Sequence, residues 1–133
     1  MLSDKTVFTN GCFDIIHRGH LELLQYCRDI GNYVIVGLNS DDSVKRLKGS
    51  ERPYFNEQDR KFLLESLSCV DEVCIFDEDT PYNIISKLKP DIIVKGGDYI
   101  PSEVVGNDIS DVIIFNFING YSTTKILDKM KWH

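Results

Sequence analysis

Short, nearly continuous apolar runs recur along this chain and alternate with stretches in which apolar residues follow helical spacing. Five runs have the length of a strand and occupy residues 6–8, 33–38, 73–76, 92–94 and 112–115. Runs without polar alternation are typical of strands that are covered on both faces. Because helical stretches separate them, we expect right-handed crossovers and a parallel sheet. The pattern predicts a single doubly wound α/β domain with five parallel strands over residues 1–133.

Between the apolar runs, apolar residues recur at helical spacing, and cap residues mark where the helices should begin. The first helix follows residue 20 and has apolar residues Leu21, Leu23, Leu24, Cys27 and Ile30. The expected caps of the later helices are Ser40 or Asp41, Asn56, Thr80 and Ser122. The helix after Asn56 should run to about residue 67, with Phe62, Leu63 and Leu67 as its apolar positions. Pro81 belongs to the first turn of a helix over residues 82–88.

Polar segments that contain glycine or hydroxyl residues follow three of the predicted strands. Residues 9–20 follow the first strand, residues 95–99 the fourth and residues 119–124 the fifth. In an open parallel sheet, the ligand binds beyond the carboxyl ends of the strands, where the strand order reverses. We therefore expect these three segments to form one site.

The net charge of the chain is −6, from 15 Lys and Arg against 21 Asp and Glu. A surface for nucleic acid normally shows as a basic excess, so nucleic acid is not an expected partner. Positive charge is instead local, at Lys45, Arg46, Lys48 and Arg52. This segment fits a small anionic ligand, and its position on a glycine-bearing loop makes Lys48, or else Lys45, a candidate phosphate clamp.

The sequence also indicates where in the cell the protein is expected. The N-terminus lacks a basic region followed by an apolar one, and no apolar run approaches the roughly 20 residues that cross a bilayer. The four cysteines form no C-x-x-C pair, and Cys27 and Cys74 lie in apolar stretches typical of the core. We expect a cytoplasmic protein with reduced thiols and no membrane partner.

Residues 9–20 form a strand-to-helix turn that holds two glycines and two histidines. Backbone N–H groups and the positive end of the helix dipole can bind phosphate at such a place, and Gly19 allows close approach. His17 and His20 could instead ligate a metal with Cys12, but no further ligand stands at a suitable spacing. The residues therefore favour phosphate, and we expect no metal ligands among them. Asp14 either bonds its own backbone in the turn or shapes the phosphate site.

These residues resemble the first signature of the cytidylyltransferase-like nucleotidyltransferases. The matching segments are residues 11–14 and 17–20, and residues 120–126 resemble the second signature, which opens the last helix. Within this superfamily, the chain is similar to the heptose 1-phosphate adenylyltransferases. That similarity lies in residues 9–11, 39–41, 45–49, 52–53, 79–81, 90–91 and 94–99.

The resemblance implies a Rossmann-like fold and the transfer of AMP from ATP to a sugar 1-phosphate, expected to be heptose 1-phosphate. Pyrophosphate would be released, and the ADP-sugar would serve lipopolysaccharide or other surface glycan synthesis. The implied catalytic residues are His17, His20 and Lys48. The implied nucleotide-binding residues are Thr9, Asn10, Gly11, Cys12, Phe13, Gly19, Arg60, Gly120, Ser122 and Thr123. The implied acceptor-binding residues are Asp14, Lys45 and Asp98. Mg²⁺ on the triphosphate and a homodimer are expected as well.

Other interpretations stay open at this point. The runner-up is a cytidylyltransferase that uses CTP and glycerol 3-phosphate, although this chain has residues 117–120 where those enzymes carry an arginine-containing block. The stretch 106–111 is shorter than in the heptose enzymes, which leaves the exact acceptor open. A nucleotide-binding module without turnover would keep the same motifs. A flavodoxin-like domain would share the alternation, but the sequence lacks the acidic cluster of a phosphoacceptor. Arg60 could form a helix-face salt bridge, and Ser122 could serve only as a cap.

Overall fold

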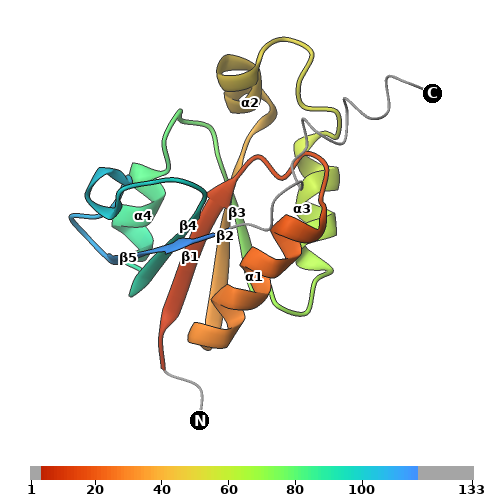
Figure 1. Cartoon of the computed structure of the whole chain (residues 1–133). Coiled ribbons are helices and arrows are strands. Elements are labelled where there is room, and N and C mark those ends of the chain that lie inside the picture. Colours follow the sequence, from red (N-terminus) through yellow and green to blue (C-terminus); the bar gives the residue numbers. More distant parts are fainter. Residues whose placement is uncertain (1–3, 117–133) are drawn as a thin grey trace.

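The structure, a computed structural model, describes residues 4–116. In this part of the chain, parallel strands form one sheet in the order β3-β2-β1-β4-β5 (Figure 1). The strands are β1 (Thr6–Gly11), β2 (Tyr33–Asn39), β3 (Glu72–Phe76), β4 (Ile92–Gly96) and β5 (Asp111–Phe115). The prediction of a five-stranded parallel α/β sheet is confirmed.

Helices lie on both faces of the sheet (Figure 1). They are α1 (Arg18–Ile30), α2 (Asp41–Lys48), α3 (Glu57–Glu65), α4 (Tyr82–Leu88) and the short 3₁₀ helix η1 (Pro101–Glu103). Leu24 of α1 and Leu64 of α3 share one buried cluster. Ile85 of α4 lies in a separate cluster with Phe8 and Ile93. No helix among the described residues is long and apolar enough to cross a membrane.

The alternation of side chains along the central strands assigns residues to the two faces. Val7 packs with Cys27 of α1, whereas the next residue, Phe8, packs with Ile85 of α4. Gly37 of β2 lies beside Phe8, and a Cβ there would stand 2.6 Å from the Phe8 ring. Glycine therefore allows that ring to lie flat against the sheet. The face of β1 that contacts α4 continues to Asn10, two residues after Phe8.

The caps of α2 and α3 are those predicted. The Ser40 hydroxyl accepts a hydrogen bond from the Ser43 amide at 3.1 Å, and the Asn56 side chain accepts one from the Asp59 amide at 2.9 Å. The expectation for Thr80 was wrong, because Pro81 is the residue that precedes α4 and no side chain caps this helix. The predicted cap Ser122 lies outside the described residues.

The predicted apolar positions of α3 were wrong for Phe62 and Leu63, whereas Leu67, beyond the end of the helix, packs against the buried cluster of Leu24 and Leu64. This helix ends at Glu65, and Phe62 is 70% exposed and Leu63 44% exposed. Its buried face is instead formed by Arg60 and Leu64, which are four residues apart and so lie on one side of the helix. A charged residue thus occupies a position that apolar spacing assigns to the core.

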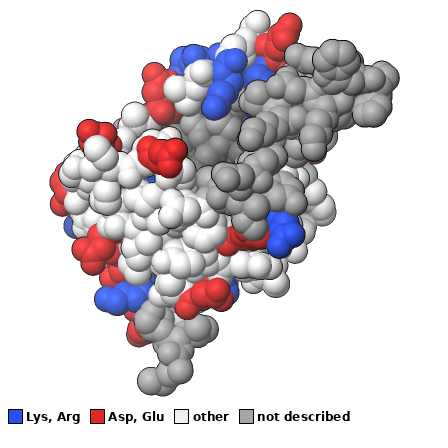
Figure 2. Space-filling view, viewed as in Figure 1, with Lys and Arg blue, Asp and Glu red and all other residues white. Residues whose placement is uncertain are grey.

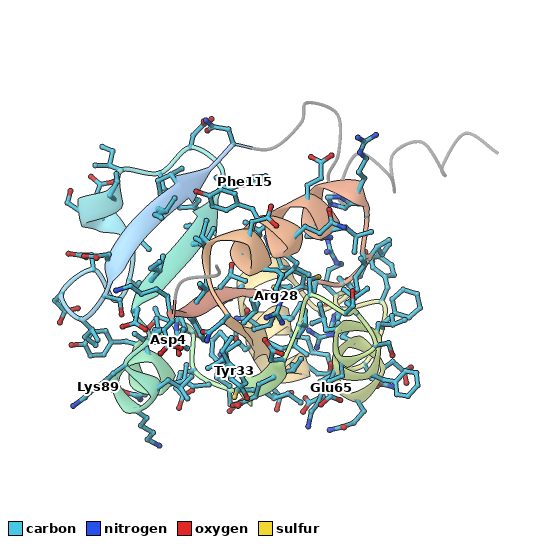
Figure 3. The ribbon with its side chains drawn as sticks, turned by 90° about the horizontal axis from the view of Figure 1, so that it is seen from below. Asp4, Arg28, Tyr33, Glu65, Lys89 and Phe115 are labelled. Carbon is cyan, nitrogen blue, oxygen red and sulfur yellow. The ribbon has the colours of Figure 1, made fainter. Side chains whose placement is uncertain are left out.

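The amino ends of the strands are held by a separate polar cluster, which Figure 3 shows from below, with Arg28 and Tyr33 labelled. Arg28 of α1 pairs with Asp71, and the same carboxylate accepts a hydrogen bond from the Val34 amide. Tyr33 donates its hydroxyl to Glu72. These contacts fix the entry of β2 and β3 and leave the opposite edge of the sheet to form the site.

Candidate active site

The strand order reverses between the central strands β1 and β4. A cavity of ≈ 590 Å³ opens beyond the carboxyl ends of the strands, with Asn10, Asn39 and Lys95 in its wall. Lys48 at the end of α2 adds a positive charge, and Figure 2 shows Lys and Arg gathered over this end of the molecule. The cavity therefore lies where the topology of a parallel sheet predicts a ligand.

The turn that follows β1 shapes one wall of this cavity. Phe13 has a φ of 46°, a left-handed conformation that is uncommon for a residue with a side chain. Its buried ring packs with Leu24 and Leu64, which holds the turn in place. A Cβ on Gly11 would stand 3.1 Å from that ring, so glycine lets the end of the strand pass close over it. The turn consequently places Cys12 and Asp14 along the cavity.

His17 and His20 form the start of α1 and line the same cavity. His17 is the cap residue, and its Nδ1 accepts a hydrogen bond from the Gly19 amide at 3.1 Å. His20 Nδ1 accepts one from the His17 amide at 3.2 Å. The two imidazoles stack with their centroids 3.9 Å apart. The histidines thus satisfy the backbone of the first helical turn, a task that Ser and Glu side chains perform in an ordinary capping box.

This geometry fixes the protonation of both rings. An Nδ1 that accepts a hydrogen bond carries no proton, so each neutral ring has its proton on Nε2. Burial lowers the pKa of His20 to about 4, and the neighbouring His17 acts in the same direction. Burial also lowers the pKa of His17. At neutral pH the pair therefore consists of neutral imidazoles with Nε2–H groups as donors.

Asp14 ties the turn after β1 to the loop before α3. Its carboxylate is almost fully buried, pairs with Arg52 at 2.8 Å and accepts hydrogen bonds from the amides of Tyr54 and Phe55. All of these partners lie about forty positions further along the chain. Asp14 lines the cavity, but its carboxylate oxygens accept hydrogen bonds from residues of the loop before α3. Its structural role therefore does not depend on the local turn bond that the sequence allowed.

Arg60 does not reach the cavity. It is fully buried, and its guanidinium donates to the carbonyl oxygens of Cys12, Asn39 and Phe55 and to the carboxylate of Asp41. The resemblance implied a nucleotide contact for this residue, which stays a prediction; in the structure its guanidinium donates to protein groups. The physical reason is that the five donors of the guanidinium match carbonyl groups at the ends of β1 and β2 and in the loop. Arg60 instead holds those three segments together.

Lys95 belongs to the segment 95–99 that was expected at the site, but no individual role was predicted for it. It lies near the end of β4 and lines the main cavity together with Lys48. Burial lowers the pKa of Lys95, and the positive charge of Lys48 lowers it further. The available signal was the position of Lys95 at the end of a central strand, beside the point where strand order reverses.

The other predicted site residues divide into three groups. Asn10, Gly11, Cys12 and Phe13 line the main cavity with the residues above. Thr9 and Gly19 are buried, whereas Lys45 and Asp98 are exposed, and none of the four lines the larger cavities among residues 4–116. Gly120, Ser122 and Thr123 lie outside the described residues. Among residues 4–116, no three His, Cys, Asp or Glu side chains come together as a metal site.

The fold and site together define an α/β domain of Rossmann-like type, with two neutral histidines at the turn that follows β1. Comparison with known proteins then gives the family. The cytidylyltransferase-like family matches residues 8–131, and the chain belongs to that family.

Relatives of high identity come from bacteria. The chain is 56% identical over 128 residues to the bifunctional protein HldE of Helicobacter pylori strain P12, and 56% identical over 128 residues to the protein of the same name from a Nitratiruptor species. Each alignment covers 96% of this chain and 28% of the relative, so the chain spans little more than a quarter of the length of these proteins.

Solved structures support the same fold. A lipopolysaccharide core biosynthesis protein from Thermoplasma volcanium is 28% identical, with a TM-score of 0.71, over 90% of this chain and 100% of that chain. A bifunctional NMN adenylyltransferase/ADP ribose pyrophosphatase from Francisella tularensis has a TM-score of 0.63 at 18% identity, over 96% of this chain and 41% of that one. The second likeness concerns the fold alone.

Proposed function

We propose that this chain is a nucleotidyltransferase that moves AMP from ATP to a sugar 1-phosphate and releases pyrophosphate. Family membership and the identity with HldE proteins support the reaction class. The similarity of residues 94–99 to heptose 1-phosphate adenylyltransferases points to heptose 1-phosphate as the acceptor. The neighbour named for lipopolysaccharide core biosynthesis fits an ADP-sugar that feeds surface glycans. A cytoplasmic location, where ATP is available, belongs to the same proposal.

One observation carries the proposal: the stacked His17 and His20, whose Nδ1 atoms are both occupied by backbone amides. Both rings line the cavity and keep their proton on Nε2, so we expect the Nε2–H groups to donate to phosphate oxygens there. Preorganised donors are typically worth about 3–4 kcal/mol each to a transition state in which negative charge develops. Such donors suit phosphoryl and nucleotidyl transfer, which need alignment and charge stabilisation more than a base.

The chemical step is an in-line displacement. An oxygen of the sugar phosphate forms a bond to the α-phosphorus of ATP, and the bond from that phosphorus to the α–β bridging oxygen breaks. Pyrophosphate leaves with the electron pair of the broken bond. His17 and His20 would donate to the triphosphate as negative charge grows on the leaving group, and Lys48 would neutralise part of that charge from α2.

Mg²⁺ has no built cage among the described residues. The two carboxylates along the cavity are engaged, since Asp14 pairs with Arg52 and Asp79 pairs with Arg46. We therefore propose Mg²⁺ only as a companion of ATP, with phosphate oxygens and water as its ligands. No step is assigned to it.

A homodimer is the proposed assembly. The family resemblance is its main support, and the exposed Phe62 and Leu63 on α3 provide apolar surface for a contact. Multi-angle light scattering should give twice the mass of the chain, and a monomer at micromolar concentration would contradict the proposal.

The test of the reaction is pyrophosphate release with ATP, CTP, GTP and UTP, each against heptose 1-phosphate, glucose 1-phosphate and glycerol 3-phosphate. Release with ATP and heptose 1-phosphate supports the proposal. Release with CTP and glycerol 3-phosphate would identify the runner-up enzyme. If no pair releases pyrophosphate while ATP still binds, the chain is a nucleotide-binding module and the proposed reaction is wrong.

A further inference from the structure

Asn10 and Lys95 are shared by three neighbouring cavities at the carboxyl edge of the sheet. The main cavity measures ≈ 590 Å³, and two smaller ones measure ≈ 150 Å³ and ≈ 140 Å³. The smaller ones differ in their walls, since one includes His20 and Leu23 of α1 and the other includes Pro81 and Val104. Asn10 and Lys95 therefore stand between a compartment on the α1 side and one on the α4 side.

The strand register shows which side these two residues face. Phe8 of β1 is paired with Ile93 of β4, and both pack against Ile85 of α4. Asn10 and Lys95 each lie two positions further along these strands, so they project from the same face. His17 and His20 belong to α1, on the opposite face. The site thus has donors from both faces of the sheet, which meet at its carboxyl edge.

Lys95 has the environment of an anion site. None of the ion pairs among residues 4–116 includes Lys95 or Lys48, whereas Arg52 and Arg60 each pair with a carboxylate. Lys95 is half-buried, and its ammonium lies 5.2 Å from the centroid of the Tyr99 ring. Two lysines that face one cavity repel each other, and a bound anion would relieve that repulsion.

The surroundings of Lys95 on the α4 side fit a phosphorylated polyol. Pro81, Val104 and Val105 supply apolar surface for the carbon face of a sugar ring, and the Glu103 carboxylate in the same wall can accept hydrogen bonds from its hydroxyls. Asp79 and Thr80 at the edge of the main cavity supply polar groups for hydroxyls, and Arg46 holds the Asp79 carboxylate at 2.8 Å. A lysine at one end and hydroxyl-binding groups at the other match the two ends of a sugar phosphate.

We propose that Lys95, with Asn10 beside it, binds the phosphate group of the acceptor from the α4 side of the sheet. His17 and His20 hold the triphosphate from the α1 side, so the attacking oxygen and the leaving pyrophosphate lie on opposite sides of the α-phosphorus. The second pKa of a phosphate monoester is about 6, so the attacking oxygen is already deprotonated at neutral pH and needs no base. This assignment rests on the proposed function, which it deepens by naming the acceptor subsite.

The test compares Lys95→Met with Lys95→Arg, and uses Lys87→Met, an exposed lysine of α4, as the matched control. Initial rates give the KM for heptose 1-phosphate, and calorimetry gives the Kd of ATP and of heptose 1-phosphate separately. For Lys95→Met we expect the KM and Kd of heptose 1-phosphate to rise roughly 10- to 100-fold, as for the loss of a charged hydrogen bond. The Kd of ATP should stay within about twofold, and Lys95→Arg should recover part of the loss because it keeps the charge. Lys87→Met should match the wild type in every measurement.

Three results would overturn the assignment. A rise in the Kd of ATP equal to the rise for heptose 1-phosphate would place Lys95 on the nucleotide. An unchanged KM and Kd for heptose 1-phosphate would remove Lys95 from the acceptor subsite. Failure of the wild type to bind heptose 1-phosphate at millimolar concentration would also contradict an acceptor subsite at Lys95. A wild type that binds heptose 1-phosphate through Lys95 but releases no pyrophosphate would refute the proposed function and leave the phosphate subsite standing.

Discussion

The neutral state of His20 makes a pH-dependent contribution to stability that can be measured. An ordinary histidine has a pKa of 6.5, and burial lowers that of His20 to about 4. Between these values the unfolded chain binds a proton on this residue and the folded chain does not. The stabilisation is therefore complete above pH 6.5 and is lost progressively as the pH falls toward 4.

The magnitude follows from the size of this pKa difference. One pKa unit is worth about 1.4 kcal/mol, so the full effect is about 3 kcal/mol below pH 4 and about 2 kcal/mol at pH 5. His17 adds to the loss in the same direction, because burial lowers its pKa too. A loss of this size is a large part of the typical stability of a domain, which is about 5–15 kcal/mol.

The assay is urea unfolding of the wild type and His20→Asn at pH 7.5 and pH 5.0, followed by circular dichroism. Asn keeps an acceptor near the position of Nδ1 for the His17 amide and removes the titrating ring. The difference in unfolding free energy between wild type and variant should shift by about 2 kcal/mol against the wild type between the two pH values. NMR titration of the His20 ring should give a pKa of about 4. A pKa near 6.5, with a difference in stability that does not change with pH, would refute the reasoning.

Three further predictions concern the groups that support the site. Arg60→Met should lower the unfolding free energy by about 3–5 kcal/mol, because it leaves Asp41 and buried carbonyls without their donor. The control Arg18→Met removes an exposed pair with Glu22 and should leave the urea midpoint almost unchanged. Equal effects of the two substitutions would contradict the structural role of Arg60. Asp14→Ala should speed hydrogen exchange at the Tyr54 and Phe55 amides, while exchange at the Val34 amide, which is bound by Asp71, should not change. Cys12 should react slowly with iodoacetamide at pH 7, because burial raises the pKa of its thiol, and ATP should slow the reaction further; peptide mapping that finds rapid labelling at pH 7 would contradict this.

The sheet and the location of the site could be predicted from the sequence for simple physical reasons. Buried parallel strands need continuous apolar runs, and residues 33–38 show such a run without interruption. The site at the ends of β1 and β4 follows from topology, and the place of His17 and His20 directly after the first strand predicts them there. Caps such as Ser40 and Asn56 were predicted because the cap bond is local.

What could not be predicted depends on contacts between distant segments. Arg60 faces the core of the molecule because carbonyl groups from Cys12, Asn39 and Phe55 converge there, which no local pattern records. The same buried arginine explains why Phe62 and Leu63 face outward on α3. Asp14 likewise acquires its partners only when β1 and the loop before α3 come together.

The central claim is adenylyl transfer to a sugar phosphate at the carboxyl edge of β1 and β4, and ³¹P NMR of the reaction mixture tests it most directly. With ATP, Mg²⁺ and heptose 1-phosphate, we predict that the monoester signal falls while pyrophosphate and an ADP-sugar, whose two phosphorus atoms are joined by a diphosphate bridge, appear in equal amounts. His17→Ala and His20→Ala should each slow this conversion strongly. Formation of ADP in place of pyrophosphate, or conversion by both histidine variants at the wild-type rate, would contradict the account.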